Sequence, residues 1–447
     1  MEQNFLQLFN QYWQVHFAEL NPSGSRLIVA VSGGVDSIVL TYVLHGLGFD
    51  FLIAHCNFHL RGEESNRDEN FVKRFAESIG KEIVCIDFDT IHYAKEKKIG
   101  VEEAARELRY SWFRQLADDY KIEGKPLPIL VAHHANDNIE TVLMNFFRGC
   151  GIAGLHGILP VNNGIYRPLL FAKRKDIVSY ALSQKLNWVE DSTNSEEKYA
   201  RNFLRNSIIP ELKENYPTIE DNLLANIHRF TDVEKIYNKH ISLIKSLLCK
   251  KTNDTYIVDI EKLKTETSFQ TILFEIFKDF GFSSNQTNEL VKLLDADSGA
   301  KIESISHIVW KDRSTLIISD KETSASEDFI FEREDSIVQL TDGSKISREN
   351  IQNVATNDTV ILDMEKLNFP LKIRRWKEGD VFYPKGMQGK KKLAKYFIDL
   401  KIPTPIKHQI WLVTSNEEIV WIAGYRADRR FTASDRTIHS IQLSFIK

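Results

Sequence analysis

The sequence predicts an α/β protein with a parallel-sheet N-terminal domain, a largely helical middle domain and a small α+β C-terminal domain. Three observations predict this order. Aliphatic runs alternate with helical patterns in the first half, helical spacing with few glycines follows, and short strand-like runs with Gly turns return at the end. The expected bounds are 1–215, 216–320 and 337–447. A chain of 447 residues is long enough for each domain to bury its own core.

Four aliphatic runs are the strand candidates of the first domain: residues 27–31, 51–56, 82–88 and 127–132. Because these runs are almost wholly apolar, we expect strands that are buried on both faces, as in a parallel sheet covered by helices. Ligands of such sheets bind beyond the carboxyl ends of the strands. The segments 32–37, 55–62 and 133–134 should therefore meet at one rim.

The later boundaries rest on turn residues and composition. Asn215-Tyr216-Pro217 ends the first domain, and residues 223–227 and 241–248 have helical spacing. An acidic, Ser-rich stretch between Ser319 and Ser336 is expected to be a linker. Strand-like runs of the last domain are residues 359–362, 371–374 and 410–413.

Composition indicates a soluble cytoplasmic protein without a membrane partner. Apolar residues make up 43% of the chain and charged residues 27%. The N-terminus lacks a basic segment followed by a long apolar run, and no apolar stretch is long enough to cross a bilayer. The four cysteines form no C-x-x-C pair, which suits a reducing compartment and argues against a zinc or iron–sulfur site.

Charge is distributed unevenly. Residues 371–447 carry 16 Lys/Arg and 7 Asp/Glu, a net charge of +9, whereas the rest of the chain carries −13. Such asymmetry predicts a polyanion-binding tail, with a solvated basic face as the alternative. The candidate phosphate contacts are Arg374, Lys390, Lys391 and Lys392. The interleaved aromatics Trp376, Tyr383, Tyr396 and Phe397 are expected to pack in the core rather than stack on bases.

The most informative segment joins the first strand to a helical pattern at 38–44. It consists of Ser32, Gly33, Gly34, Val35, Asp36 and Ser37. Its glycines let the backbone approach a ligand, the helix start offers N–H groups to an anion, and Asp36 offers a carboxylate to a phosphate-bound metal. This hexapeptide is neither a G-x-x-x-x-G-K-[ST] nor a G-x-G-x-x-G loop. It resembles the S-G-G-x-D-S pyrophosphate loop of enzymes that split ATP into AMP and pyrophosphate; an ordinary glycine turn is the alternative.

A second cluster lies where the strand at 127–132 gives way to a helix. His133, Asp137 and Glu140 are spaced by four and three, so they share a helix face if the helix begins early enough, with Asn136 or Asp137 as its cap. Such a set can hold Mg²⁺, take a proton from an amine or bind a lysine-like cation. The alternative is a cap followed by a solvent-exposed polar turn.

Three further segments carry cations. Residues 102–110 form a helix whose Arg109 faces either a nucleotide or solvent, and residues 147–155 form a Gly-rich loop. A turn at 190–194 precedes Arg201, Asn202 and Arg205, which lie about one helical turn apart. This last patch suits phosphate or RNA backbone, with an exposed basic turn as the alternative.

Taken in order, these clusters resemble the tRNA(Ile)-lysidine synthetase family over nearly the whole chain. The motifs are H-x-N-F-H-L-R-G, E-x-x-A-R-x-x-R-Y, A-H-H-x-x-D-x-x-E-T, R-G-x-G-x-x-G-L, D-x-x-N…R-N-x-x-R and R-x-W-x-x-G-D…G-x-K-K-L. The family's third cluster usually reads A-H-H-x-D-D-Q. Asn136 and Asn138 replace its first Asp and its Gln here, so only Asp137 inherits the acidic role.

The resemblance implies a ligase that uses ATP and Mg²⁺. It would adenylate C2 of the wobble cytidine in a tRNA(Ile) with a CAU anticodon, and free lysine would then displace AMP. The product, lysidine, changes the codon read from AUG to AUA. Because a free ammonium has a pKa near 10.4, the second step needs a carboxylate base.

The resemblance also implies roles for residues. The catalytic set is Asp36, Asp137, Glu140 and Arg205, with Asp36 on the metal and Asp137 and Glu140 on lysine. The nucleotide set is the hexapeptide with His133 and Arg109. The tRNA set is Arg201, Asn202, Arg374, Lys390, Lys391 and Lys392.

Two other functions remain as alternatives. A tRNA-thiolating enzyme of the same ATPase class generally needs paired cysteines, which this chain lacks. A catalytically inactive RNA-binding protein on the same fold would not need Asp36, Ser37, His133 and Asp137. The oligomeric state stays open, a homodimer included, as do the tRNA bases that the later domains read.

Overall fold

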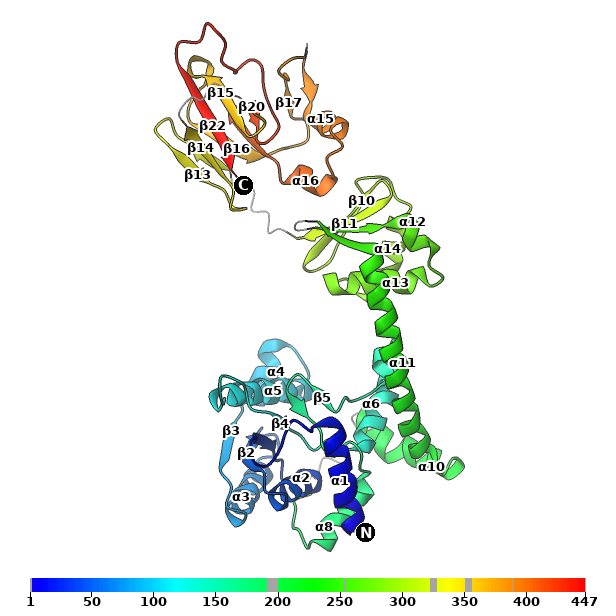
Figure 1. Cartoon of the computed structure of the whole chain (residues 1–447). Helices are drawn as coiled ribbons and strands as arrows, with labels where there is room; N and C mark the ends of the chain where they lie inside the picture. Colours follow the sequence, from blue (N-terminus) through cyan, green and yellow to red (C-terminus); the bar gives the residue numbers. More distant parts are fainter. Residues whose placement is uncertain are drawn as a thin grey trace. The chain divides into compact units, whose positions relative to one another are not determined.

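The structure is a computed structural model that describes residues 2–190, 200–252, 255–321, 328–349, 356–387 and 389–446. Its contacts divide the chain into two units, Met1–Asn238 and Lys239–Lys447, whose elements are shown in Figure 1. Among the described residues, no helix is both long and apolar enough to cross a membrane.

The first unit alternates strands and helices. Its strands are β1 (Arg26–Ala30), β2 (Asp50–Asn57), β3 (Ile83–Asp87), β4 (Ile129–Leu130), β5 (Val161–Asn162) and β6 (Ile165–Tyr166). Its helices are α1 (Glu2–His16), α2 (Val35–Gly46), α3 (Glu63–Ser78), α4 (Thr90–Lys97), α5 (Val101–Asp119), α6 (Ala135–Arg148), α7 (Ile152–Leu155), α8 (Arg174–Ser183), α9 (Ala200–Phe203), the π-helical turn η2 (Leu204–Ile208), α10 (Ile209–Asn215) and most of α11 (Ile219–Leu248).

The strands form one six-stranded sheet in the order β3-β2-β1-β4-β6-β5. All neighbours are parallel except β5 and β6, so the predicted parallel sheet is confirmed. The chain passes from β1 to β2 and β3 on one side, and β4 then pairs with β1 on the other side. The strand order therefore reverses between β1 and β4, which is where such sheets bind ligands.

Both faces of this sheet are covered around β1, which explains the apolar run of that strand. Leu27 and Val29 of β1 pack in one core with residues of α1, α2 and α8, helices that lie together in Figure 1. Ile28 faces the opposite core, which includes Trp112 and Phe113 of α5. Alternate residues of β1 thus enter different cores, so its run from Leu27 to Ala30 is apolar throughout.

The second unit contains the end of α11 and four sheets. Its strands are β7 (Cys249–Thr252), β8 (Thr255–Asp259), β9 (Lys301–Glu303), β10 (His307–Asp312), β11 (Thr315–Asp320), β12 (Phe329–Phe331), β13 (Ile337–Gln339), β14 (Lys345–Glu349), β15 (Thr359–Asp363), β16 (Leu371–Arg375), β17 (Val381–Phe382), β18 (Lys391–Lys392), β19 (Trp411–Ser415), β20 (Glu418–Ile422), β21 (Arg426–Ala427) and β22 (Ser440–Ile446). Its further helices are α12 (Ile260–Thr265), α13 (Phe269–Phe277), η3 (Lys278–Phe280), η4 (Ser284–Gln286), α14 (Thr287–Leu293), η5 (Met364–Lys366), α15 (Leu393–Asp399) and α16 (Thr404–His408).

The middle region contains more strand than the sequence predicts. Besides α11 to α14, it has a five-stranded antiparallel sheet in the order β7-β8-β11-β10-β9. The β10–β11 hairpin turns at Arg313, a non-glycine residue with φ of +53°, so the usual Gly signal of a hairpin is missing. The stretch predicted as a linker includes β12, and its residues 322–327 lie outside the described residues.

The C-terminal part is α+β, as predicted. Two antiparallel sheets, β12-β16-β19-β20-β21 and β13-β14-β22-β15, share one core that includes Leu371, Trp421 and Leu443. The runs predicted at 359–362, 371–374 and 410–413 correspond to β15, β16 and β19. A second core encloses Phe382, Tyr396 and Phe397 around α15.

Candidate active site

The hexapeptide forms the turn between β1 and α2. Gly34 is the N-cap of α2, a 12-residue helix, and no side chain caps the helix there. The Ser37 hydroxyl accepts a hydrogen bond from the Ser32 N–H at 3.2 Å and donates one to the Gly34 carbonyl at 2.9 Å. The loop thus holds its own shape and leaves the N–H groups of the first helical turn to an anion.

Only glycine fits at position 33, because the backbone conformation and the neighbouring side chain leave no room for a Cβ atom. Its φ is +93°, and a Cβ atom there would lie 2.7 Å from Cγ2 of Val189. The Val189 N–H also donates to the Gly33 carbonyl at 3.0 Å, which keeps the two backbones close. The second letter of the hexapeptide is therefore fixed by packing as well as by turn geometry.

We expect Gly33→Ala to lower the free energy of unfolding of the first unit by about 1–3 kcal/mol and to weaken ATP binding. The reason is that the alanine would have a strained backbone conformation and its Cβ atom would clash with Val189. Gly46→Ala is the matched control: a Cβ at Gly46, the last residue of α2, has no neighbour within 4 Å. Urea denaturation and ATP titration measure both variants. Equal stability of the two variants would contradict the steric argument.

The start of α6 differs from the prediction in one respect. The helix begins at Ala135 with His134 as N-cap, so Asn136 and Asp137 are not the cap. The Asp137 carboxylate accepts from the His134 N–H at 2.9 Å, and the Asp137 N–H donates to Nδ1 of His134 at 3.3 Å. His133 precedes the helix and does not share its face. Asp137 and Glu140 do share a face, at i and i+3.

Two arginines hold these carboxylates. Arg201 of α9 donates to Glu140 at 2.6 Å and to Asp137 at 2.8 Å. Arg205 donates to Glu140 at 2.6 and 2.9 Å and to Asp137 at 3.2 Å. Glu140 is only 1% exposed. The predicted cationic patch is therefore paired with the predicted acidic patch, and the four side chains form one neutral cluster.

Arg205 belongs to η2, and π-helical turns are rare and frequently occur at functional sites. Asn202 lies in α9, next to Arg201. The predicted D-x-x-N turn at 191–194 lies outside the described residues.

His134 connects this cluster to the hexapeptide. Its Nδ1 accepts a hydrogen bond from the Asp137 N–H at 3.3 Å, and its Nε2 lies 3.9 Å from Oδ2 of Asp36. The pairing of β1 with β4, in which Ile28 lies opposite Ile129, brings these two strand ends together. The cluster and the hexapeptide are consequently one site at the switch point of the sheet.

Burial and charge set the protonation of this site. Burial raises the pKa of Asp36, although His134 and Arg174 oppose the shift. Burial alone would also raise the pKa of Asp137, but His134 and Arg201 outweigh it and hold that pKa below its usual value. Burial lowers the pKa of His133 to about 4, so this imidazole is neutral at pH 7.

Two buried atoms at the site have no hydrogen-bond partner among the residues that the structure describes. They are Oδ1 of Asp36 and Nδ1 of His133. Buried polar atoms in native proteins are nearly always bonded, so each of these is suited to a ligand. The predicted roles of Asp36 in metal binding and of His133 in nucleotide binding stay predictions.

His134, Asn136 and Arg174 contribute to this site and were not among the predicted site residues. Asn136 accepts from the Arg174 N–H at 3.0 Å and donates to Glu220 of α11 at 3.0 Å. Its amide therefore ties α6 to α8 and α11. The spacing of His134 and Asp137 is that of a capping box, but His is not a usual cap, so the signal was weak.

Arg109 lies elsewhere on the same rim. Its guanidinium is 5.1 Å from the centre of the Phe58 ring, beyond the carboxyl end of β2. The structure therefore places it beside a cavity next to β2 and β3.

One of the predicted tRNA contacts is wrong. Arg374 is only 3% exposed and makes two hydrogen bonds to Asp380, at 2.9 and 2.8 Å. Its side chain is part of the C-terminal fold and is closed to a phosphate. Lys391 pairs with Asp399 at 2.6 Å, whereas Lys390 and Lys392 are exposed. Tyr396 and Phe397 are buried, as predicted.

We expect Arg374→Ala to destabilise the second unit by about 3 kcal/mol, because it leaves the Asp380 carboxylate without its partner. Lys392→Ala should change stability by less than about 0.5 kcal/mol and instead weaken tRNA binding and reduce its salt dependence. Thermal unfolding and tRNA titration at two salt concentrations distinguish these outcomes. An Arg374→Ala protein of unchanged stability with weaker tRNA binding would restore the original prediction.

The first strand of the parallel sheet leads into this hexapeptide, and an acidic helix start lies beside it at the switch point of the sheet. These two features define a PP-loop protein that uses ATP. Residues 1–212 match the family described as PP-loop domain. Residues 251–321 match the TilS substrate binding domain, and residues 371–443 match the TilS substrate C-terminal domain.

Curated relatives extend these matches over most of the chain. The tRNA(Ile)-lysidine synthase of Parabacteroides distasonis is 38% identical over 94% of this chain and 95% of its own length. That of Bacteroides thetaiotaomicron is 38% identical over 92% and 93%, and that of Clostridium acetobutylicum is 30% identical over 92% and 93%. The chain belongs to the tRNA(Ile)-lysidine synthase family. It is a PP-loop ligase that uses ATP and modifies tRNA, which confirms the predicted enzyme class.

Proposed function

We propose that this protein joins free lysine to C2 of the wobble cytidine of a tRNA(Ile) with a CAU anticodon, through an adenylated cytidine. The modified anticodon would read AUA in place of AUG. One observation carries the proposal: two carboxylates that can hold an amine, Asp137 and Glu140, lie beside a pyrophosphate-binding loop, with His134 between them and Asp36. The names of the relatives point to the same product.

In the first step, O2 of the cytosine attacks the α-phosphate of ATP, and pyrophosphate leaves. The free N–H groups at the start of α2 would stabilise the charge on the departing pyrophosphate. Asp36 fits a Mg²⁺ ligand, because its Oδ1 is buried and unpartnered among the described residues. Protein-bound Mg²⁺ commonly uses one or two carboxylates and completes its shell with water and phosphate oxygens, where it neutralises charge.

In the second step, the lysine amine attacks C2, a C–N bond forms, and AMP leaves with the former O2. The amine must first lose a proton, which passes to a carboxylate of the cluster. While the arginines bind Asp137, its lowered pKa suits it to hold an ammonium rather than to accept a proton. Lysine would displace a guanidinium from the cluster, which frees Arg201 or Arg205 for phosphate and leaves a carboxylate in contact with the amine that must lose its proton.

The tRNA would bind the region after residue 215. We propose three domains with bounds of 1–215, 216–320 and 337–447. The first domain would carry out catalysis, and the other two would bind tRNA. The net charge of +9 over residues 371–447 and the exposed Lys390 and Lys392 support binding of the RNA backbone there.

The decisive experiment incubates the full-length protein with ATP, Mg²⁺, labelled lysine and a tRNA(Ile) transcript with a CAU anticodon. We expect label in the tRNA and one AMP released per lysine incorporated. A transcript with a different wobble base is the matched control. Transfer of label from a sulfur donor would instead indicate a thiolating enzyme, and tRNA binding without AMP release would indicate an inactive RNA-binding protein.

A further inference from the structure

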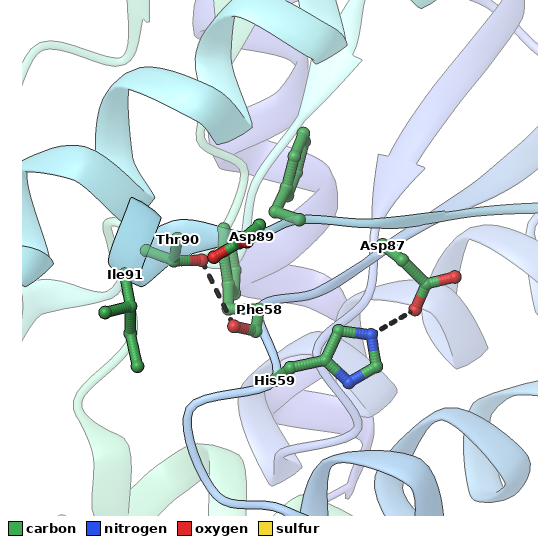
Figure 2. A pocket seen from close by; sticks show the side chains of 7 residues that line it. Phe58, His59, Asp87, Asp89, Thr90 and Ile91 are labelled. Atoms are coloured by element: carbon green, nitrogen blue, oxygen red, sulfur yellow. Dashed lines mark hydrogen bonds and ion pairs between the residues drawn. The ribbon is translucent and has the colours of Figure 1, made fainter. Parts of the chain in front are cut away.

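A cavity of about 320 Å³ opens beyond the carboxyl ends of β2 and β3 (Figure 2). Its lining includes Phe58, His59, Asp87, Phe88, Asp89 and Ile91. None of these residues belongs to the hexapeptide or to the cluster of Asp137, Glu140 and the two arginines. The cavity nevertheless lies on the same rim of the sheet, one and two strands away from β1.

The cavity has the features of a built site. The rings of Phe58 and Phe88 are stacked, with centres 5.5 Å apart and an interplanar angle of 23°. Arg109 lies over the Phe58 ring. His59 is bonded to Asp87 at 2.7 Å and has a φ of +51°, a conformation that few non-glycine residues adopt. Backbone strain of this kind persists where the surrounding structure enforces it, often at ligand sites.

Two buried polar side chains of β2, His55 and Asn57, make hydrogen bonds near the hexapeptide and near the cavity. His55 is 4% exposed and bonds the Val31 carbonyl at 2.8 Å, directly before the hexapeptide. Asn57 is 2% exposed, donates to Glu69 at 2.8 Å and accepts from the His59 N–H at 3.1 Å. Because the lining of the cavity shares no residue with the hexapeptide, the cavity is a second site on this rim.

The chemistry of the lining selects one class of ligand. Aromatic faces stack on nucleobases of any sequence. Asp87 and Asp89 at the rim are exposed, and carboxylates accept hydrogen bonds from exocyclic amino groups such as N4 of cytosine. The same two charges repel phosphate, so the cavity suits a base and not the backbone. Proteins that read RNA loops commonly bind such splayed bases.

We propose that this cavity holds an unstacked, amino-bearing base of the anticodon loop, next to the cytidine that reacts at the hexapeptide. Strands lie about 4.8 Å apart, so the cavity is displaced by roughly 5–10 Å along the rim, a distance that a neighbouring nucleotide spans. The inference rests on the proposed function only for the identity of the RNA loop.

The test uses the full-length protein and an anticodon stem-loop RNA with 2-aminopurine at each loop position in turn. We expect one position other than the wobble base to change its fluorescence on binding. Phe58→Leu should abolish that change and weaken RNA binding about 5-fold or more. Phe58→Tyr should preserve both, and the ATP affinity should stay constant in all variants. Leu182→Ala, at an exposed site of α8, is the control for surface substitution.

A second variant keeps the proposal testable if Phe58→Leu does not fold. Ile91 is 50% exposed, so Ile91→Trp can fill the cavity from its rim and should weaken RNA binding similarly. Unchanged RNA affinity in the folded variants would overturn the proposal. Loss of ATP affinity in parallel would assign the cavity to the adenine of ATP instead. Failure of lysine incorporation by the unaltered protein would refute the proposed function and leave this binding result intact.

Discussion

Asp137→Asn is expected to lower lysine incorporation into tRNA by about 100-fold or more, the usual range for loss of a group that transfers a proton. The same variant should retain ATP–pyrophosphate exchange in the presence of tRNA, because the first step does not use the amine. Filter binding of labelled tRNA and an exchange assay measure the two steps separately.

The asparagine keeps the structure of the helix start. Its amide oxygen can accept from the His134 N–H, as the Asp137 carboxylate does at 2.9 Å, and Glu140 still binds both arginines. Asp118→Asn, at an exposed position of α5, is the matched control and should leave both assays unchanged. If Asp137→Asn incorporated lysine at the normal rate, the role of the acidic cluster in binding the amine would be refuted.

Asp36→Asn is expected to abolish both steps, with exchange reduced by about 100-fold or more, because a neutral amide holds Mg²⁺ more weakly than a carboxylate does and less Mg²⁺ then remains to neutralise the phosphate charge. The exchange assay over a range of Mg²⁺ concentrations measures the effect. Asp50→Asn, at an exposed site at the start of β2, is the control. A normal exchange rate in Asp36→Asn would show that the metal and the pyrophosphate are bound without this carboxylate.

The same residue predicts a pH dependence. Burial raises the pKa of Asp36, so this carboxyl gains its proton at a higher pH than an ordinary Asp does. The exchange rate of the unaltered protein should therefore fall, as the solution is acidified, above the usual titration range of Asp near pH 3.9. An acid limb of the unaltered protein centred at about pH 3.9 or below would contradict this expectation.

Much of the N-terminal domain was predictable because local patterns specify it. The strands β1, β2 and β3 lie within a residue or two of the runs predicted at 27–31, 51–56 and 82–88. The first two runs are buried on both faces, whereas β3 is an edge strand and is only half-buried. The fourth strand is shorter, with only Ile129 and Leu130 in β4. The middle sheet was missed because its β10–β11 hairpin turns at Arg313 and lacks the usual glycine.

The site was predictable as a set of residue types and not as a set of contacts. The spacing of Asp137 and Glu140 placed both on one helix face. That Arg201 and Arg205 neutralise them depends on side chains more than 60 positions away, and no local pattern contains that information. Arg374 was misassigned for the same reason, since its burial against Asp380 results from the fold of the second unit.

The sequence by itself determined the chemistry of the hexapeptide, the order of the clusters and the family. These follow from residue types at short spacing, which fix turns, helix faces and hydrogen-bonding groups. Only the tertiary structure decided that the hexapeptide and the acidic cluster form one site, that His134 connects them and that the two arginines occupy the carboxylates. The two parts of the site meet because β4 pairs with β1 across about 100 intervening residues. Such pairing depends on the packing of the whole sheet rather than on any one segment of it.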